Sequence, residues 1–192
     1  MNHKRAFITL GLATAALAPL PVLAQAQAYF GAGLGISDAK KFCEVRTDCD
    51  QGSTAWRVFG GVQFTPNIGV EIGYVDLGET RGTDASGTLT KRETTATDLV
   101  AVLSYPRNRL SVSAKVGGYY GKPKATFETA TGTSYARESK GGLTYGLGAQ
   151  YDFTPAFALR ADWQRYAQVG GATTGSEADI DAFMIGIVWK TR

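Results

Sequence analysis

The sequence predicts an all-β fold, an eight-stranded antiparallel up-and-down barrel, and two features of its 192 residues indicate it. Apolar side chains alternate with glycine or polar side chains in eight segments, which is the period of a strand with two unlike faces. Short turn-forming connections alternate with long polar ones, as in a meander. Eight strands of such a meander can close on themselves and leave no sheet edge.

The first half of the chain supplies four predicted strands, at residues 29–36, 56–64, 68–75 and 97–105. The first three alternate regularly between apolar residues and glycine or polar residues. The fourth is less regular, because either Leu99, Ala101 and Leu103 or Val100 and Val102 can form its apolar face. We adopt the first alternative for this strand.

The second half supplies the other four predicted strands, at residues 110–120, 143–153, 157–164 and 182–189. The stretch LTYGLGAQYDFTP shows the pattern most clearly, since every second residue is bulky and apolar and those between are Thr, Gly, Gly, Gln and Asp. One face of each strand is therefore apolar, and the other is small and polar.

The connections between these strands alternate in length. Tight turns are predicted at residues 65–67, 106–108 and 154–156, where Pro stands beside Thr, Asn or Arg. Long polar loops are predicted at residues 37–53, 79–94, 122–140 and 167–179. The short turns therefore gather at one end of the barrel and the long loops at the other.

The two faces indicate a transmembrane barrel with lipid outside and a polar, packed interior. The apolar face carries more than thirty side chains, which the narrow lumen of eight strands has no room to hold. The other face is rich in glycine and carries four charges of each sign: Arg57, Glu71, Asp98, Lys115, Asp152, Arg160, Asp162 and Lys190. Of these, Asp98, Asp152 and Lys190 lie near predicted strand ends, where we expect water to reach them.

Five of the interior charges are predicted to form a paired network: Arg57, Glu71, Lys115, Arg160 and Asp162. Aligning the hairpins FTPNIGVEIGY and FTPAFALRADW by their prolines puts Glu71 level with Arg160, and Lys115 falls level with Asp162. The alternative is that water in the lumen hydrates each charge separately.

Aromatic residues mark the two levels at which a membrane barrel carries its girdles. The predicted girdle near the long loops comprises Trp56, Tyr74, Tyr120, Trp163 and Phe183. The girdle near the short turns comprises Phe64, Tyr105, Phe153, Phe157 and Trp189.

The first 26 residues are expected to be a signal peptide, which leaves residues 27–192 as the barrel domain. Lys4 and Arg5 precede a short apolar stretch, and Ala24-Gln25-Ala26 fits a small-x-small cleavage site. Val22-Leu23-Ala24 is a second possible site, with cleavage after Ala24. The alternative, a membrane-anchoring helix, would need a longer apolar run than the one that Pro19 interrupts.

Export favours a disulfide between the two cysteines, Cys43 and Cys49, in the first long loop. The net charge of +3 gives no reason to expect nucleic-acid binding. The single histidine, His3, lies in the leader, so we expect neither an acyl-transfer site nor a metal or cofactor site in the barrel.

The segments AYFGAGLG, WRVFGGVQFTPNIGVEIGYVDLG, SVSAKVGGYYG, YGLGAQYDFTPAFALRADWQRY and MIGIVWK, in this order, resemble the OmpA-like eight-stranded barrels of Gram-negative outer membranes. The resemblance implies outer-membrane localisation, insertion by the outer-membrane assembly machinery, and roles in envelope integrity, adhesion or weak ion conduction. It carries no peptidoglycan-binding domain into this chain. One departure is VWKTR, in which Thr191 stands where the family usually has an aromatic residue.

Three functions follow from the resemblance: a structural barrel, a surface module that acts in adhesion or host recognition through its loops, and a narrow ion pore. No surface ligand can be named. Basic residues in or beside the loops could contact lipopolysaccharide phosphates or simply be solvated: Lys40, Lys41, Arg46, Arg81, Lys91, Arg92, Lys122, Lys124, Arg137 and Lys140.

Overall fold

The structure is a computed structural model that describes residues 26–39, 47–50, 52–83, 89–129, 132–137, 139–169 and 178–191. Ten strands follow one another along the described chain: β1 (Gln27–Ala39), β2 (Thr47–Asp50), β3 (Gly52–Thr65), β4 (Ile68–Thr83), β5 (Leu89–Arg107), β6 (Leu110–Thr129), β7 (Gly132–Arg137), β8 (Lys140–Asp152), β9 (Phe157–Val169) and β10 (Ala178–Lys190).

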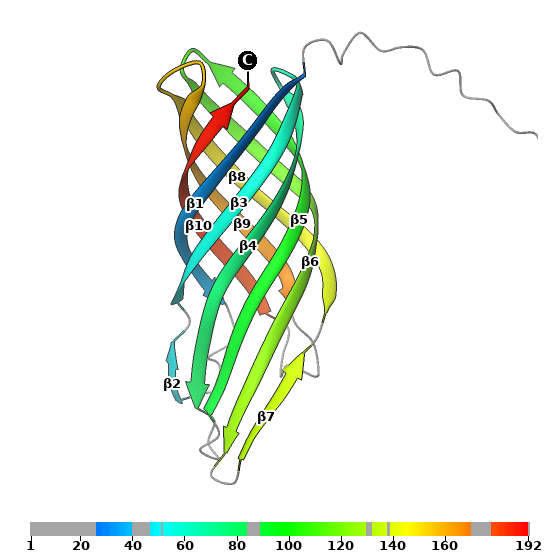
Figure 1. Ribbon diagram of the computed structural model, residues 1–192, viewed down its shortest axis with the longest axis vertical. Coiled ribbons are helices and arrows are strands. Elements are labelled where there is room, and N and C mark those ends of the chain that lie inside the picture. Colours follow the sequence, from blue (N-terminus) through cyan, green and yellow to red (C-terminus); the bar gives the residue numbers. More distant parts are fainter. Residues whose placement is uncertain are drawn as a thin grey trace, which may run out of the picture.

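Eight of these strands form the wall of a closed barrel (Figure 1). In the order β1, β3, β4, β5, β6, β8, β9 and β10, each strand pairs antiparallel with the next, and β10 pairs with β1 to close the barrel. The predicted eight-stranded up-and-down barrel is therefore confirmed. The described residues contain no helix that is long and apolar enough to cross a membrane.

The predicted tight turns join β3 to β4, β5 to β6 and β8 to β9, and the first and last use a Thr-Pro pair in the same way. Thr65 Oγ1 accepts hydrogen bonds from the backbone N–H groups of Asn67 (3.3 Å) and Ile68 (3.0 Å). Thr154 Oγ1 likewise accepts one from the N–H of Phe157 (2.9 Å). A hydroxyl that satisfies turn donors stabilises the turn, which gives the repeated FTP segment a physical role.

The segments predicted as the second and third long loops are mostly strand. β4 continues to Thr83, β5 begins at Leu89 and β6 continues to Thr129, where β7 pairs back along it. We call residues 79–83 of β4, 89–95 of β5, 122–129 of β6 and all of β7 the projecting sheet, which extends past the other strands at the long-loop end (Figure 1).

The loop prediction for residues 79–94 and 122–140 is therefore wrong, and the reason is physical. Beyond the membrane, outward positions face water, so the apolar alternation stops although the strands continue. The inward positions of β5 in this sheet are Thr90, Arg92 and Thr94, all buried. β-branched Thr favours strands even where no apolar face marks them.

Side-chain exposure settles the register of β5. Leu99 and Leu103 are 57% and 56% exposed on the outside of the barrel, whereas Val100 and Val102 are 1% and 4% exposed inside it. The adopted alternative for this strand is confirmed.

The lumen is filled in three levels, which we name by position. The turn-end cup is a cavity of about 180 Å³ at the short-turn end, lined by Tyr29, Gln63, Ser111, Ser113 and Gln150, among others. The charged layer above it comprises Arg57, Glu71, Asp98, Lys115, Arg160 and Asp162.

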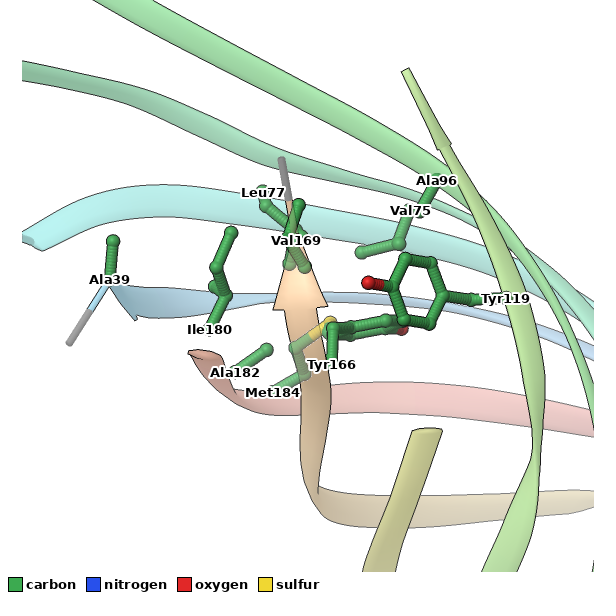
Figure 2. Close-up of a cluster of buried hydrophobic side chains, with 10 residues drawn as sticks. All are labelled: Ala39, Val75, Leu77, Ala96, Tyr119, Tyr166, Val169, Ile180, Ala182 and Met184. Atoms are coloured by element: carbon green, nitrogen blue, oxygen red, sulfur yellow. The ribbon is translucent and has the colours of Figure 1, made fainter. Parts of the chain in front are cut away.

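The apolar layer lies beyond the charged layer, toward the long loops (Figure 2). It comprises Ala39, Val75, Leu77, Ala96, Tyr119, Tyr166, Val169, Ile180, Ala182 and Met184. Its presence corrects the expectation of a polar interior, because only part of the lumen is polar.

Candidate functional site

Glu71 occupies the centre of the charged layer, on β4, and its side chain is fully buried. Its carboxylate accepts hydrogen bonds from Arg57 Nη1 at 2.7 Å, Arg160 Nη1 at 2.7 Å and Lys115 Nζ at 3.4 Å. Tyr29 Oη donates a fourth at 3.2 Å. These donors come from β3, β9, β6 and β1, so one carboxylate connects five strands.

Asp98, on β5, is the second carboxylate and is 1% exposed. It accepts hydrogen bonds from Arg57 Nη2 (2.6 Å), Tyr166 Oη (2.9 Å) and Gln164 Nε2 (3.4 Å). Gln164 Nε2 also donates to Thr144 Oγ1 on β8 at 2.9 Å. Arg57 therefore bridges both carboxylates with the two ends of its guanidinium fork, the geometry that arginine favours for carboxylates.

Asp162, on β9, completes the layer. It forms ion pairs with Lys115 Nζ at 2.8 Å and with Arg160 Nε at 2.7 Å. The layer thus holds three cations and three carboxylates, and each cation contacts two carboxylates. Such a balance is what burial requires, since an unpaired charge in the interior costs several kcal/mol.

The structure brings together all five residues of the predicted network. Arg160 contacts Glu71, and Lys115 contacts Asp162, as their aligned heights suggest. Asp98 corrects the expectation of a hydrated strand end, because β5 is longer than predicted and this residue lies well inside it. The alternation of the strand already placed Asp98 on the inward face. The predicted strand boundary at residue 97 made it look like a strand end.

Asp152 and Lys190, also expected near water, lie at the mouth of the turn-end cup. They form an ion pair with each other at 2.7 Å, and their side chains are 32% and 17% exposed. Arg92, which the sequence grouped with loop charges, instead points into the barrel, is buried and donates to the carbonyl of Val169 at 2.9 Å.

Small and aromatic neighbours hold the charged side chains in place. The guanidinium of Arg57 fills the space over Gly73, where an added Cβ would lie 2.5 Å from Arg57 Nη2. The guanidinium of Arg160 stacks on the ring of Phe59, 3.7 Å from its centroid. Cation–π contact of this kind stabilises a desolvated guanidinium.

The ten predicted girdle residues take outward positions on the barrel wall. Eight are 39–66% exposed, and Trp163 and Phe64 are half-buried. Sequence reasoning missed Phe30 and Tyr145, which pack against Trp189 and Trp163 with ring centroids 4.4 and 6.1 Å apart. Both lie at outward-facing positions of the alternating pattern, from which they could have been predicted.

The predicted disulfide lies outside what the structure describes. Cys43 falls outside the described residues, and Cys49 lies in β2, where only the backbone is described. Within the described residues there is no group of three or more His, Cys, Asp or Glu residues that could hold a metal ion.

A closed antiparallel barrel with an apolar outer belt and paired charges inside defines a β-barrel protein of the outer membrane. Residues 23–192 match the model of the OmpA-like transmembrane domain, and the chain belongs to this family. It is therefore a protein of the Gram-negative outer membrane.

Two relatives show how far this likeness extends. Outer membrane protein A of Salmonella typhi is 27% identical over 169 residues, which cover 84% of this chain and 47% of that protein. Outer membrane protein A of Shigella dysenteriae is 27% identical over 190 residues, 92% of this chain and 53% of that protein. The chain thus spans about half the length of these relatives.

Solved structures share the fold at low identity. The attachment invasion locus protein Ail of Yersinia pestis superposes with a TM-score of 0.60 at 17% identity, over 86% of this chain and 98% of Ail. Neisserial surface protein A gives a TM-score of 0.56 at 16% identity, over 85% of this chain and 97% of that protein.

Proposed function

We propose that this chain is a structural, non-enzymatic protein whose barrel contributes to the integrity of the outer membrane. The observation that supports this role is the filled lumen. Six charged side chains from five strands, and an apolar layer beside them, occupy the space that a diffusion porin leaves to water. A barrel of this kind is a rigid membrane element rather than an open channel.

The test is a deletion strain assayed for survival in detergent and bile salts. Deletion should sensitise the cells, and the parent gene on a plasmid should restore resistance. A strain that carries the Glu71→Gln variant is compared with the parent strain at equal amounts of protein in the outer membrane. This comparison separates the function of the barrel from its stability. Unchanged resistance in the deletion strain would contradict the proposed role.

A second candidate function is recognition of an anionic surface ligand by the projecting sheet. Its outward positions carry Arg81 directly opposite Lys91, and Lys122 and Lys124 lie two and four residues beyond Tyr120 of the girdle. That spacing is roughly 7 and 14 Å along β6, the region of lipid head groups. Ail has been solved in complex with the heparin analogue sucrose octasulfate.

Lipopolysaccharide phosphates and a sulfated host glycan offer this sheet the same chemistry, a cluster of anionic oxygens. A Lys122→Gln/Lys124→Gln variant should bind the true ligand, whether lipopolysaccharide or glycan, with lower affinity. Its binding should also depend less on salt concentration. Separate arms use lipopolysaccharide vesicles and immobilised heparin. Arg107→Gln/Arg109→Gln is the matched control, because it removes the same charge at the turn end. Equal binding by both variants would exclude the sheet.

Two further assignments belong to this proposal. Residues 1–26 act as a signal peptide, and the outer-membrane assembly machinery inserts the barrel. N-terminal sequencing of protein from purified outer membranes tests the first: a start at residue 25 or 27 supports it, and a start at Met1 contradicts it. Depletion of the assembly machinery tests the second and should leave the barrel unfolded in the periplasm.

A further inference from the structure

We propose that the apolar layer, and not the charged layer, is the barrier that closes the lumen to ions. The two layers lie one above the other along the same path. On β4, Glu71 is followed by inward Gly73 and then Val75, and on β6, Lys115 is followed by inward Gly117 and then Tyr119. An ion that crossed the charged layer would therefore meet apolar side chains next.

Six of the eight wall strands contribute to the apolar layer: β1, β4, β5, β6, β9 and β10. Each of these six strands places at least one apolar side chain in the layer, and every side chain of the layer is at most 6% exposed. Figure 2 shows Val75 and Met184 near the rings of Tyr119 and Tyr166, with Ala39 at the opposite side of the cluster. The two rings meet edge to face, with centroids 5.5 Å apart.

The hydroxyl groups of the two tyrosines are held by protein partners. Tyr166 Oη donates down to Asp98 at 2.9 Å, and Tyr119 Oη donates to the carbonyl of Ala167 at 2.6 Å. The ring of Tyr119 is fixed against the wall by Gly142, where an added Cβ would lie 2.6 Å from it. Both hydroxyls therefore already donate to protein acceptors, and the rest of each side chain in the layer is apolar.

Cavity volumes on the two sides of the layers differ accordingly. The turn-end cup, below the charged layer, measures about 180 Å³. On the long-loop side, a cavity lined by Ala39, Leu77 and Ile180 of the apolar layer, together with polar groups of Ser37, Thr80, Arg92 and Thr94, measures about 10 Å³. A space of roughly 10–15 Å³ holds a single water molecule. Water can therefore reach the charged layer from the turn end, whereas the cavity at the apolar layer has room for about one molecule.

The charged layer is the weaker barrier because it offers partners to an ion. Carboxylates and guanidinium groups can exchange with water or with a passing ion. An apolar constriction offers none, and it blocks conduction by excluding water altogether. Transfer of an ion into such a region carries the full cost of lost hydration.

The experiment is conductance of the purified barrel in planar lipid bilayers. Tyr119→Ser/Met184→Ser opens and polarises the apolar layer and should raise the mean current about tenfold or more, the change expected when a barrier falls by about 1.4 kcal/mol. Glu71→Gln, which breaks the charged layer and leaves the apolar layer whole, should stay at the parent current. Heat-modified mobility in SDS gels identifies the folded fraction of each variant.

A conservative pair of variants decides the question even if the double variant does not fold. Val75→Thr and Val102→Thr make the same nearly isosteric change at buried inward positions, one in the apolar layer and one at the turn-end cup. Val75→Thr should raise the current, and Val102→Thr should not. A current that rises with Glu71→Gln, or that stays at the parent level in Val75→Thr, would overturn the proposal.

Discussion

Replacement of Glu71 and Arg160, singly and together, measures how strongly the charged layer stabilises the barrel. Glu71→Gln leaves three cations facing two carboxylates, and Arg160→Met leaves three carboxylates facing two cations. Each single variant therefore contains one unmatched buried charge and should lose at most about 3–5 kcal/mol of unfolding free energy, because water from the turn-end cup can hydrate part of that charge.

The double variant restores the balance at two charges of each sign. It should therefore cost less than the sum of the single variants, with a coupling energy of about 1–3 kcal/mol. The contacts that remain, Arg57 to Asp98 and Lys115 to Asp162, keep the other four charges paired at 2.6 and 2.8 Å. Full cancellation is not expected, because Arg160→Met also removes the stacking on Phe59.

The assay is urea unfolding of the barrel in lipid vesicles, followed by the fluorescence of its three tryptophans. Lys190→Met is the control, because it breaks an ion pair that is 17% and 32% exposed and should cost less than about 1 kcal/mol. Strictly additive losses would refute the reasoning, since they would mean that Glu71 and Arg160 do not depend on each other.

Three further outcomes are expected. Asn108→Cys, at a short turn, should resist an impermeant thiol reagent on intact cells, whereas Tyr135→Cys should react. Both variants are made with the two native cysteines replaced. The opposite labelling would show that the barrel has the reverse orientation. Unreduced peptides from the native protein should contain those two cysteines as a disulfide by mass spectrometry, and free thiols in freshly purified protein would disprove it. Gly142→Ala forces a Cβ against the ring of Tyr119 and should cost about 1–3 kcal/mol in unfolding experiments, whereas Gly118→Ala has its nearest neighbour at 3.7 Å and should cost much less.

The sequence predicted the barrel wall because the bilayer imposes a strict rule on it. Outward positions inside the membrane are apolar, so alternation identifies the strands. In β5 the inward residues Val100 and Val102 are apolar as well, and alternation alone left its two faces open. The rule ends where the membrane ends. Thr80 and Thr90 lie in strand segments that have no apolar outward face. Alternation therefore predicts loops where the projecting sheet is found.

The interior was predictable only in part, since its contacts join distant strands. Aligned hairpins gave the heights of Glu71 and Arg160, because both hairpins begin with the same FTP turn. The apolar layer has no such guide. Tyr119 and Tyr166 meet only because of the stagger of the strands around the barrel, a quantity that alternation within one strand does not contain.

The distribution of charge along the chain bears on how the barrel can be assembled. Three hairpins, β3–β4, β5–β6 and β8–β9, supply the whole charged layer. The first contributes Arg57 and Glu71, the second Asp98 and Lys115, and the third Arg160 and Asp162, so each hairpin is electrically neutral within the layer.

The link between the first and third hairpins, Arg160 to Glu71, spans 89 positions of the chain and forms only when the sheet is nearly complete. Until that moment each hairpin enters the membrane with its own counter-charge. Within the charged layer, each hairpin of the half-built barrel therefore already has as many cations as carboxylates, and the cross-hairpin ion pairs are gained at closure.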